Sequence, residues 1–443
     1  MMNYTEATQY IYSLFNIERK EYMSDAKHCG VYLTRLQFFL DILGNPEKRI
    51  PHYIHVTGTS GKGSVTNMLH SILAQNGWKT ASNISPHPTS IEERWRIDDR
   101  HMSRDEFVPL VEQTIKPALD QYIRTSPYDM ISFFELMTAL GLYWFAEQQS
   151  EWCILEVGCG GRYDSTNIIP HKDIAVITNI GLDHLGIIGN TIEEIAKEKA
   201  GIINTKCPVF SMEKNTAIQN IIQSESRDQK TNCTFVSHTA TDISPNKKGM
   251  SFVYDEESYT IPVHGIHQIH NAELAITIAK ELHIPLKVIQ QGLAQTSFEL
   301  RTQIVSTKPL TILDGAHNTD KMATTVDTVQ MIQQQYKHPQ QDIHLLLGFS
   351  ADKHIDDMLT QLAKLQPKTV SCTKNTVNLF KSVVSPQELA KKIQALLPKT
   401  TVYMSLDPQD AYKWSIEKQA KHDILLITGS IYLSGELSQY LQR

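Results

Sequence analysis

Hydrophobic residues along this chain repeat with two alternating periods. Short apolar runs rich in β-branched residues, such as 53–56 and 152–155, are typical of buried strands. Between such runs, apolar residues recur every three to four positions, as from Val65 to Leu73, which predicts amphipathic helices. Strands that alternate with helices favour an α/β fold with a mostly parallel sheet.

The pattern changes around residues 296–302, and 443 residues are too many for one ordinary core. We therefore predict two domains: a P-loop nucleotide-binding parallel-sheet domain over 1–297, and a smaller, Rossmann-like α/β domain over 302–443. The first contains a helical segment over 4–45 and a hairpin around 255–257. The strands predicted in the second are Leu310–Leu313, Ile343–Leu347, Thr369–Cys372, Thr401–Met404 and Ile424–Thr428.

Composition narrows the class of protein. The formal charge is −6 and basic blocks are absent, which argues against nucleic acid as the main partner. No apolar run approaches membrane-spanning length, and the N-terminus lacks the pattern of a signal peptide. The six cysteines form no C-x-x-C pair, so we interpret them as reduced thiols. We expect a cytoplasmic protein.

The strongest chemical signal is the stretch 55–64, which reads HVTGTSGKGS. It lies between a predicted strand and a predicted helix, where glycines allow backbone N–H groups to approach a polyphosphate and Lys62 can reach the terminal phosphates. The spacing G-x-x-G-K-x-S differs from the common G-x-x-x-x-G-K-[ST]. A glycine–lysine turn is often only a surface turn, but the flanking strand and helix favour nucleotide binding.

Polar residues also follow other predicted strands. Glu156 follows strand 152–155 and precedes a glycine-rich loop, and the pair Asp183-His184 follows strand 174–178. A buried carboxylate needs a partner, and magnesium is the one that a nucleotide site supplies. A capping or turn acid and a structural histidine are the alternatives. Carboxyl ends of parallel strands share one edge, which favours a site built from several strand ends.

Several other features have ordinary structural explanations. Lys199, in the last turn of a predicted helix, is explained by the helix dipole. His264, His267 and His270 are spaced by three residues, which is not diagnostic of a metal site. The stretch 132–135 is a capping box.

In this order the motifs resemble the folylpolyglutamate synthase/dihydrofolate synthase family, a branch of the Mur ligases, nearly from end to end. The residues that carry the resemblance are 43–46, 55–64, 85–87 with 93–94, 155–167, 183–184, 198–201, 271–272, 314–318 and 428–432. The resemblance implies an ATP-dependent ligase that joins L-glutamate to a folate or pteroate carboxylate through an acyl phosphate.

The resemblance also implies roles for individual residues. Those expected to bind ATP are Gly58, Thr59, Gly61, Lys62, Gly63, Ser64, Asn271, Arg301, Asp314 and His317. Those expected to hold magnesium, with two sites, are Ser64, Ser85, Glu156 and His184. Lys199 falls on the family's carbamylated lysine, so that a modification would turn this cation into a carboxylate. With Lys62, Glu156 and His184, it completes the expected catalytic set.

The pterin substrate is expected to contact Ser132, Phe133, Phe134, Glu135, Arg162, Tyr163 and Asp164. We expect small-molecule partners only, with neither membrane nor nucleic acid, and a monomeric enzyme. The segment 18–35 matches the family poorly where dihydropteroate would be bound, so the choice between dihydropteroate and tetrahydrofolate stays open.

Two other hypotheses remain. One is a Mur-type amide ligase that acts on a different carboxylate substrate. The other is an ATP-binding scaffold without turnover, which has no chemical need for Lys62, Glu156, His184 and Lys199 together. A P-loop phosphotransferase is disfavoured by the loop spacing and by the second α/β domain.

Overall fold

A computed structural model describes residues 2–16, 29–336, 341–351, 354–378 and 381–441. This part of the chain forms two compact units. One contains Met1–Thr239 and His270–Thr296, and the other contains Ala240–Ile269 and Ser297–Arg443. Residues 240–269 therefore belong to the same compact unit as the second part of the chain. The predicted domain bounds, 1–297 and 302–443, stay a prediction.

The first unit is built on an eight-stranded sheet with the order β4-β3-β2-β5-β1-β6-β7-β8. The six strands from β2 to β8 run parallel, and β3 and β4 add an antiparallel edge. The strands are β1 (His52–Thr57), β2 (Thr80–Asn83), β3 (Trp95–Ile97), β4 (Arg100–His101), β5 (Trp152–Glu156), β6 (Ile174–Ile177), β7 (Val209–Ser211) and β8 (Cys233–Phe235).

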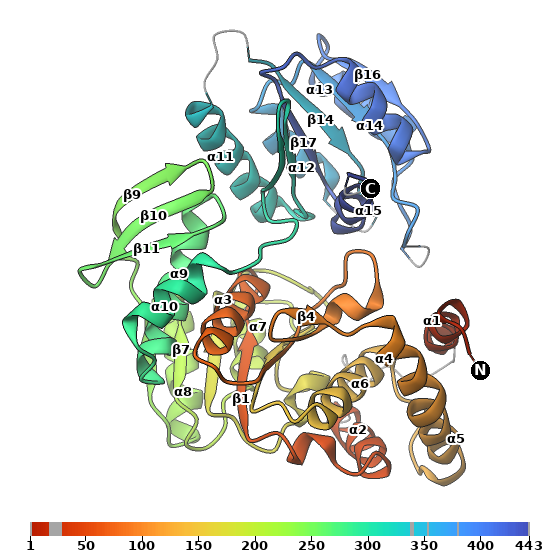
Figure 1. The fold of residues 1–443 in the computed structure, drawn as a ribbon, viewed down its shortest axis with the longest axis vertical. Helices are drawn as coiled ribbons and strands as arrows, with labels where there is room; N and C mark the ends of the chain where they lie inside the picture. The colour runs from red at the N-terminus through yellow and green to blue at the C-terminus, as the bar shows by residue number, and fades with distance from the viewer. Residues whose placement is uncertain (1, 17–28, 337–340, 352–353, 379–380, 442–443) are drawn as a thin grey trace. The chain divides into compact units, whose positions relative to one another are not determined.

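Helices surround this sheet (Figure 1). They are α1 (Tyr4–Ser13), α2 (Val31–Ile42), α3 (Lys62–Gln75), α4 (Arg104–Pro109), α5 (Lys116–Thr125), α6 (Phe133–Glu147), α7 (Ile192–Ala200), α8 (Thr216–Asp228), α9 (Ile266–Glu281) and α10 (Leu286–Ala294). Short turns of other helix types are η1 (Leu14–Asn16), η2 (Pro46–Lys48), η3 (Ile91–Arg94), η4 (Leu110–Ile115) and η5 (Ser165–Ile168). The central strands β1, β5 and β6 are almost entirely buried, as expected for a sheet covered on both faces.

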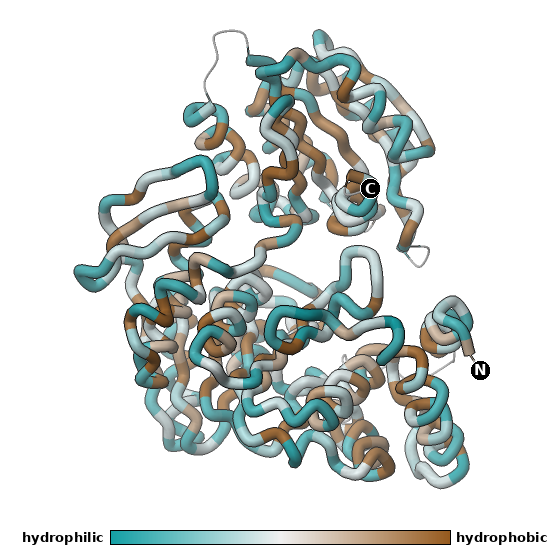
Figure 2. Tube along the Cα trace, in the orientation of Figure 1, coloured by the Kyte–Doolittle hydropathy of each residue, from teal (hydrophilic) through white to brown (hydrophobic). Residues whose placement is uncertain are grey.

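The second unit contains a six-stranded sheet with the order β12-β13-β17-β14-β15-β16. Its strands are β12 (Gln303–Thr307), β13 (Leu310–Leu313), β14 (Ile343–Leu347), β15 (Thr369–Cys372), β16 (Thr401–Met404) and β17 (Ile424–Thr428). Its helices are α11 (Thr319–Gln335), α12 (Ile355–Ala363), α13 (Pro386–Leu396), α14 (Pro408–Glu417) and α15 (Ile431–Leu441). Strands of this sheet are largely hydrophobic in Figure 2, and hydrophilic residues gather on the outer loops.

The same unit also carries a three-stranded antiparallel sheet with the order β11-β10-β9. Its strands are β9 (Thr241–Asn246), β10 (Gly249–Tyr254) and β11 (Glu257–Ile261). The predicted hairpin around 255–257 is confirmed, because Asp255 and Glu256 have the positive φ angles of a tight turn. The hydroxyl of Tyr336, the residue after α11, donates to the Lys247 carbonyl (3.4 Å), and the small sheet contacts α11 through β9 (Figure 1).

The predicted fold class, two parallel α/β sheets in sequence, is confirmed. All five predicted strands of the second sheet, β13 to β17, have the predicted bounds. Strand β12 was not predicted, because a half-buried edge strand that pairs on one side lacks a continuous apolar run. Within the described residues, no helix combines the length and apolar character needed to cross a membrane.

Candidate functional site

A tight turn joins β1 to α3, and its glycines are required by contact as well as by conformation. Gly58 and Gly61 have φ angles of +144° and +86°. A Cβ on Gly58 would lie 1.9 Å from the Thr178 hydroxyl, and one on Gly61 would lie 2.5 Å from Asn271 Oδ1. The turn is therefore packed against β6 and α9, and the first N–H groups of α3 offer a site for an anion.

Two lysines converge on this turn. The Lys62 ammonium donates to the Gly58 carbonyl at 2.8 Å, and the Lys199 ammonium donates to the same oxygen at 3.0 Å. Lys199 is buried, with 2% of its surface exposed. The helix dipole therefore does not account for the main contact of Lys199, because its side chain reaches from the end of α7 to the Gly58 carbonyl in the turn between β1 and α3.

The environment of Lys199 changes its protonation. Burial lowers its pKa to about 8, and the positive charge of Lys62 acts in the same direction. Near neutral pH, the Lys199 side chain is therefore a neutral amine more often than an ordinary lysine is. A neutral amine is the form that acts as a nucleophile.

Carboxyl ends of three neighbouring strands bring the predicted magnesium ligands to one edge of the sheet. Glu156 ends β5, lies opposite Val56 in β1 and is 6% exposed. Its carboxylate accepts a hydrogen bond from the Ser85 N–H (3.0 Å), which follows β2. Ser64 lies buried in the first turn of α3. A buried carboxylate beside serine oxygens is the kind of donor set that Mg²⁺ prefers.

The fourth predicted ligand, His184, lies in the loop after β6. Its side chain is 38% exposed, and Nε2 is 3.6 Å from Asp183 Oδ2. The residue has a φ angle of +50°, an uncommon conformation outside glycine. Its place on the same sheet edge fits the sequence expectation, while its role as a ligand stays a prediction.

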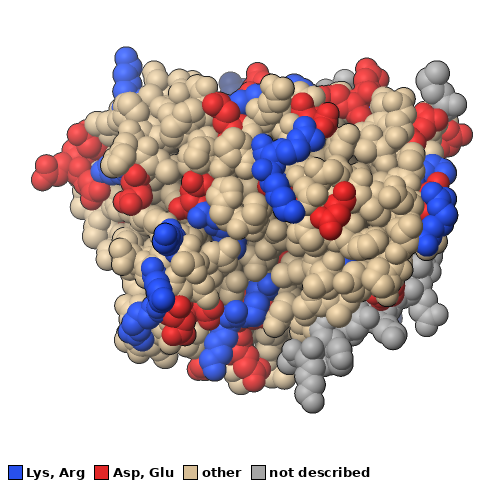
Figure 3. Space-filling model, turned by 90° about the horizontal axis from the view of Figure 1, so that it is seen from below, with Lys and Arg blue, Asp and Glu red and all other residues tan. Residues whose placement is uncertain are grey.

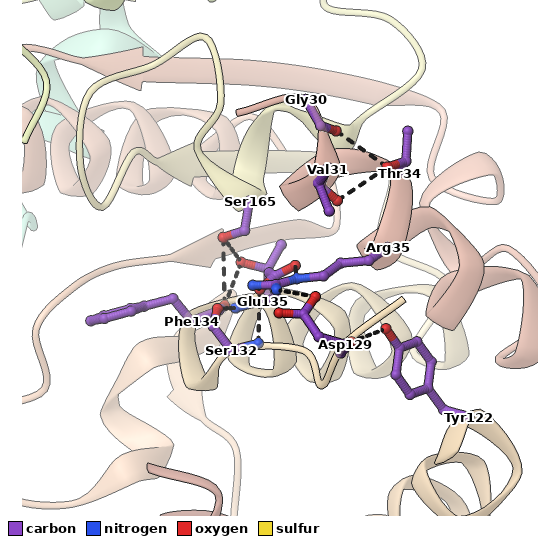
Figure 4. A network of polar contacts seen from close by, with 11 residues as sticks. Gly30, Val31, Thr34, Arg35, Tyr122, Asp129, Ser132, Phe134, Glu135 and Ser165 are labelled. Carbon is purple, nitrogen blue, oxygen red and sulfur yellow. Dashed lines mark hydrogen bonds and ion pairs between the residues drawn. The ribbon is translucent and has the colours of Figure 1, made fainter. Parts of the chain in front are cut away.

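The predicted substrate residues 132–135 begin α6. Ser132 and Glu135 form the predicted capping box, and Glu135 also makes a two-point ion pair with Arg35 at 2.8 Å and 2.6 Å (Figure 4). Arg35 is fully buried and reaches Asp129 as well. The Glu135 carboxylate is therefore occupied by structural partners, which the sequence did not reveal because Arg35 lies 100 residues away.

The aromatic residues of this segment face different surroundings. Phe133 is buried and stacks on Phe15, with ring centroids 4.3 Å apart. Phe134 is 54% exposed. Figure 4 shows that the Phe134 side chain points away from the Arg35–Glu135 pair. Phe134 is therefore the side chain of 132–135 that is accessible to a ligand.

The other predicted substrate stretch, 162–164, belongs to the glycine-rich loop after β5. Asp164 is buried and accepts hydrogen bonds from the N–H groups of Gly158 (3.1 Å) and Cys159 (2.9 Å). Arg162 pairs with Glu225 at 2.9 Å, and the Tyr163 N–H donates to Glu198. Burial raises the pKa of Asp164. These contacts fix the loop, while the expected contacts with substrate stay a prediction.

The second unit contains the remaining predicted ATP residues. Asp314 ends β13, and its carboxylate accepts from the N–H groups of Thr302 (2.9 Å) and Ala316 (2.8 Å) and from the Thr325 hydroxyl. His317 Nδ1 is 2.8 Å from the Gly315 carbonyl, and Arg301 lies beside Gly315. The structure thus gathers Arg301, Asp314 and His317 at the end of one strand.

On the face shown in the space-filling view of Figure 3, acidic and basic side chains are interspersed among uncharged residues.

Comparison with known proteins identifies the class of this chain. Residues 129–279 match the model of the Mur ligase middle domain, and residues 300–431 match that of the Mur ligase glutamate ligase domain. The chain is 31% identical to the dihydrofolate synthase/folylpolyglutamate synthase of Bacillus subtilis, over 93% of this chain and 95% of the relative. It is 30% identical to the folylpolyglutamate synthase of Lacticaseibacillus casei, over 99% of both chains.

A solved structure extends the likeness to the fold. The Mycobacterium tuberculosis folylpolyglutamate synthase complexed with ADP superposes with a TM-score of 0.84 and 25% identity, covering 100% of this chain and 99% of that one. Sequence and structure therefore agree over the full length. The chain belongs to the folylpolyglutamate synthase/dihydrofolate synthase family of the Mur ligases, which are ATP-dependent, amide-bond-forming enzymes.

Proposed function

We propose that this enzyme joins the amino group of L-glutamate to the carboxylate of a folate or pteroate, with ATP and magnesium. The observation that carries the proposal is the turn at 58–61, where Lys62 and Lys199 meet at one carbonyl in a chain with relatives of this activity. ATP is the expected nucleotide, because the similar M. tuberculosis enzyme was solved with ADP.

The proposed nucleotide site uses the first turn of α3 for the phosphates, with Lys62 beside them. Asn271 of α9 lies against this turn, close to Gly61, which supports its proposed contact with ATP. Arg301, Asp314 and His317 are proposed to contact ATP from the second unit. Because Asp314 already accepts four hydrogen bonds, its contribution is partly to hold the turn that follows β13.

Magnesium is proposed to bind at the sheet edge, in two sites. The buried carboxylate of Glu156, with Ser64 and Ser85, fits a hard cation that prefers oxygen ligands, and His184 would complete the set. Bound magnesium would neutralise charge that moves between phosphate and carboxylate oxygens.

The reaction follows in two balanced steps. A substrate carboxylate oxygen attacks the γ-phosphorus of ATP, and the bond to the β–γ bridging oxygen breaks, giving an acyl phosphate and ADP. The glutamate amine then attacks the acyl carbon, loses a proton and expels inorganic phosphate. Lys62 holds the phosphoryl group and offsets its charge, so the protein contributes positioning and electrostatics more than covalent chemistry.

The proposed substrate side is formed by 132–135 and 162–164. Phe134, the exposed aromatic of the first stretch, is suited to stack against a flat ring. Glu135 and Asp164 act as positioning residues, because their carboxylates are engaged by Arg35 and by the loop N–H groups. We further propose a cytoplasmic monomer whose partners are small molecules, in line with the net charge of −6.

Release of inorganic phosphate tests this function. The assay contains ATP, magnesium and L-glutamate, with dihydropteroate or tetrahydrofolate in separate arms. Release with dihydropteroate alone would identify a dihydrofolate synthase, release with tetrahydrofolate alone a polyglutamate synthase, and release in both arms a bifunctional enzyme. No glutamate-dependent release in either arm would contradict the folate assignment and favour a different carboxylate substrate.

Substitution of Glu156 tests the magnesium site. Glu156→Gln removes the negative charge but keeps the shape and an acceptor for the Ser85 N–H. We expect the magnesium concentration needed for half-maximal phosphate release to rise by about tenfold or more, because a carboxylate ligand has become a weak neutral one. The matched control is Glu193→Gln, an exposed position in α7. An unchanged magnesium requirement in Glu156→Gln would show that this carboxylate is not a ligand.

Carbamylation of Lys199 is the second proposal that can be tested directly. The lysine amine would attack carbon dioxide, forming an N–C bond and releasing one proton, which leaves a carboxylate at the lysine tip. Because the pKa of Lys199 is lowered to about 8, its neutral amine becomes more abundant as the pH rises toward 8. We therefore expect a carbamate ¹³C signal from enzyme in ¹³C-bicarbonate that grows over this range.

The control for this signal lies two residues away. Lys199→Met should remove the signal and most of the phosphate release, whereas Lys197→Met, at an exposed position of the same helix, should keep both. A signal that survives in Lys199→Met would assign the carbamate to another amine.

A further inference from the structure

Two histidines and a buried carboxylate lie together where the chain leaves the first unit and returns to it. His238 and Thr239 are the last residues before the chain enters the second unit, and His270 is the first residue after its return. Glu273 follows three positions later, on the same helix, α9. None of these side chains belongs to the proposed ligase machinery.

Their ligand atoms are close together. His238 Nδ1 is 2.9 Å from Glu273 Oε2, and the Thr239 N–H donates to Glu273 Oε1 at 2.8 Å. The rings of His238 and His270 stack with their centroids 3.7 Å apart and 14° between their planes, so one ring must turn before both rings can direct a nitrogen at one cation. One ligand atom from each of His238, His270 and Glu273 lies within 4.8 Å of the others.

Charge and burial point to a cation at this cluster. Glu273 is fully buried, and a buried carboxylate is costly unless positive charge or several hydrogen bonds compensate it. Its partner His238 carries charge only when protonated. Burial lowers the pKa of His270 to about 4, with His238 and Lys214 acting in the same direction and Glu273 opposing them, so at neutral pH the His270 ring is uncharged and one ring nitrogen carries a lone pair.

We propose that His238, His270 and Glu273 form a binding site for a divalent first-row transition cation of the Zn²⁺ type. Two imidazoles and one carboxylate are a common zinc set, and water can complete the tetrahedron. His270 and Glu273 are three residues apart, which places them on one face of α9. The cation would replace the hydrogen between His238 and Glu273, with the ring proton held at Nε2.

The chemistry of the donors separates this site from the magnesium site. Magnesium prefers oxygen ligands and dehydrates reluctantly, whereas imidazole nitrogen suits zinc and its neighbours in the transition series. A bound cation would tie the segment before β9 to the first turns of α9. It would therefore stabilise the folded first unit, since a ligand that binds only the native state raises the melting temperature.

In the first experiment, the intact, metal-stripped enzyme is titrated with Zn²⁺ in excess magnesium, and binding is followed by calorimetry. In the second, Co²⁺ replaces Zn²⁺ as the probe, and binding is followed by visible absorption. We expect one Zn²⁺ per chain, a tetrahedral Co²⁺ spectrum and a higher melting temperature. Glu273→Gln and His238→Asn should each weaken Zn²⁺ binding by about tenfold or more. The matched control is His283→Asn, at an exposed position whose positive φ suits asparagine, and it should bind as the parent does.

Two results would overturn the proposal. One is the lack of a stoichiometric site in the parent enzyme. The other is Zn²⁺ binding of equal strength in the parent, Glu273→Gln and His238→Asn, which would place the metal elsewhere. If Glu273→Gln does not fold, His238→Asn decides the matter, because asparagine keeps a polar group that can donate to Glu273 in place of His238. Neither result depends on ligase activity, so these experiments test the zinc site independently of the proposed function.

Discussion

Replacement of Lys62 by alanine is expected to lower phosphate release by about 100- to 1,000-fold, the usual cost of removing one preorganised group that stabilises transition-state charge. Lys62 is half-buried at the start of α3, and its ammonium lies 2.8 Å from the Gly58 carbonyl, inside the proposed phosphate site. Release of inorganic phosphate under saturating magnesium measures the effect. The fold should persist, because β1 and α3 are held by apolar packing.

The matched control is Lys116→Ala. Lys116 makes an exposed ion pair with Asp120 one turn away on α5, so its loss should leave turnover and stability nearly unchanged. Comparable turnover of Lys62→Ala and the parent would contradict the proposed phosphate site, provided that both proteins show the same circular dichroism.

Replacement of Arg35 by methionine is expected to destabilise the first unit by about 3–5 kcal/mol, because it strands a buried charge. Arg35 is 0% exposed and binds the 2%-exposed Glu135 at two points, with Asp129 as a further partner. The shift of the urea midpoint measures the loss. Glu135→Gln alone should also destabilise the protein, and the double variant Arg35→Met/Glu135→Gln should lose less than the sum of the two.

A surface pair provides the comparison for this cycle. Arg49 and Glu147 lie 2.8 Å apart, but both are nearly half exposed, so Arg49→Met should cost at most about 1 kcal/mol. If Arg35→Met proved as mild as Arg49→Met, the Glu135 carboxylate would be free to serve the substrate. The larger loss of unfolding free energy expected for Arg35→Met would instead show that Glu135 positions the start of α6.

The local pattern of hydrophobic and polar residues was sufficient to predict most of the fold. Apolar runs predicted strands such as β13 and β14 at their observed bounds, since burial on both faces of a parallel sheet demands a continuous hydrophobic stretch. The capping box at 132–135 predicted the start of α6, because the box satisfies N–H groups within four residues. The strand–turn–helix context of Lys62 likewise predicted the phosphate loop.

Long-range packing decided what local pattern could not. From the sequence, Lys199 resembles any lysine at a helix end, and only the packing of α7 on the sheet brings it to the Gly58 carbonyl. Arg35 and Glu135 are 100 residues apart, and their pairing depends on how α2 packs against α6.

The histidines also illustrate the difference between what local sequence pattern and long-range packing determine. Their spacing of three residues in the chain was not diagnostic of a metal site. His238, which completes the cluster with His270 and Glu273, comes from a segment 35 residues before Glu273. The sequence by itself therefore determined most of the strands and helices, the strand–turn–helix around Lys62 and the family of this protein. The tertiary structure alone decided which charged groups meet, because burial and pairing of polar side chains depend on neighbours that are distant in the chain.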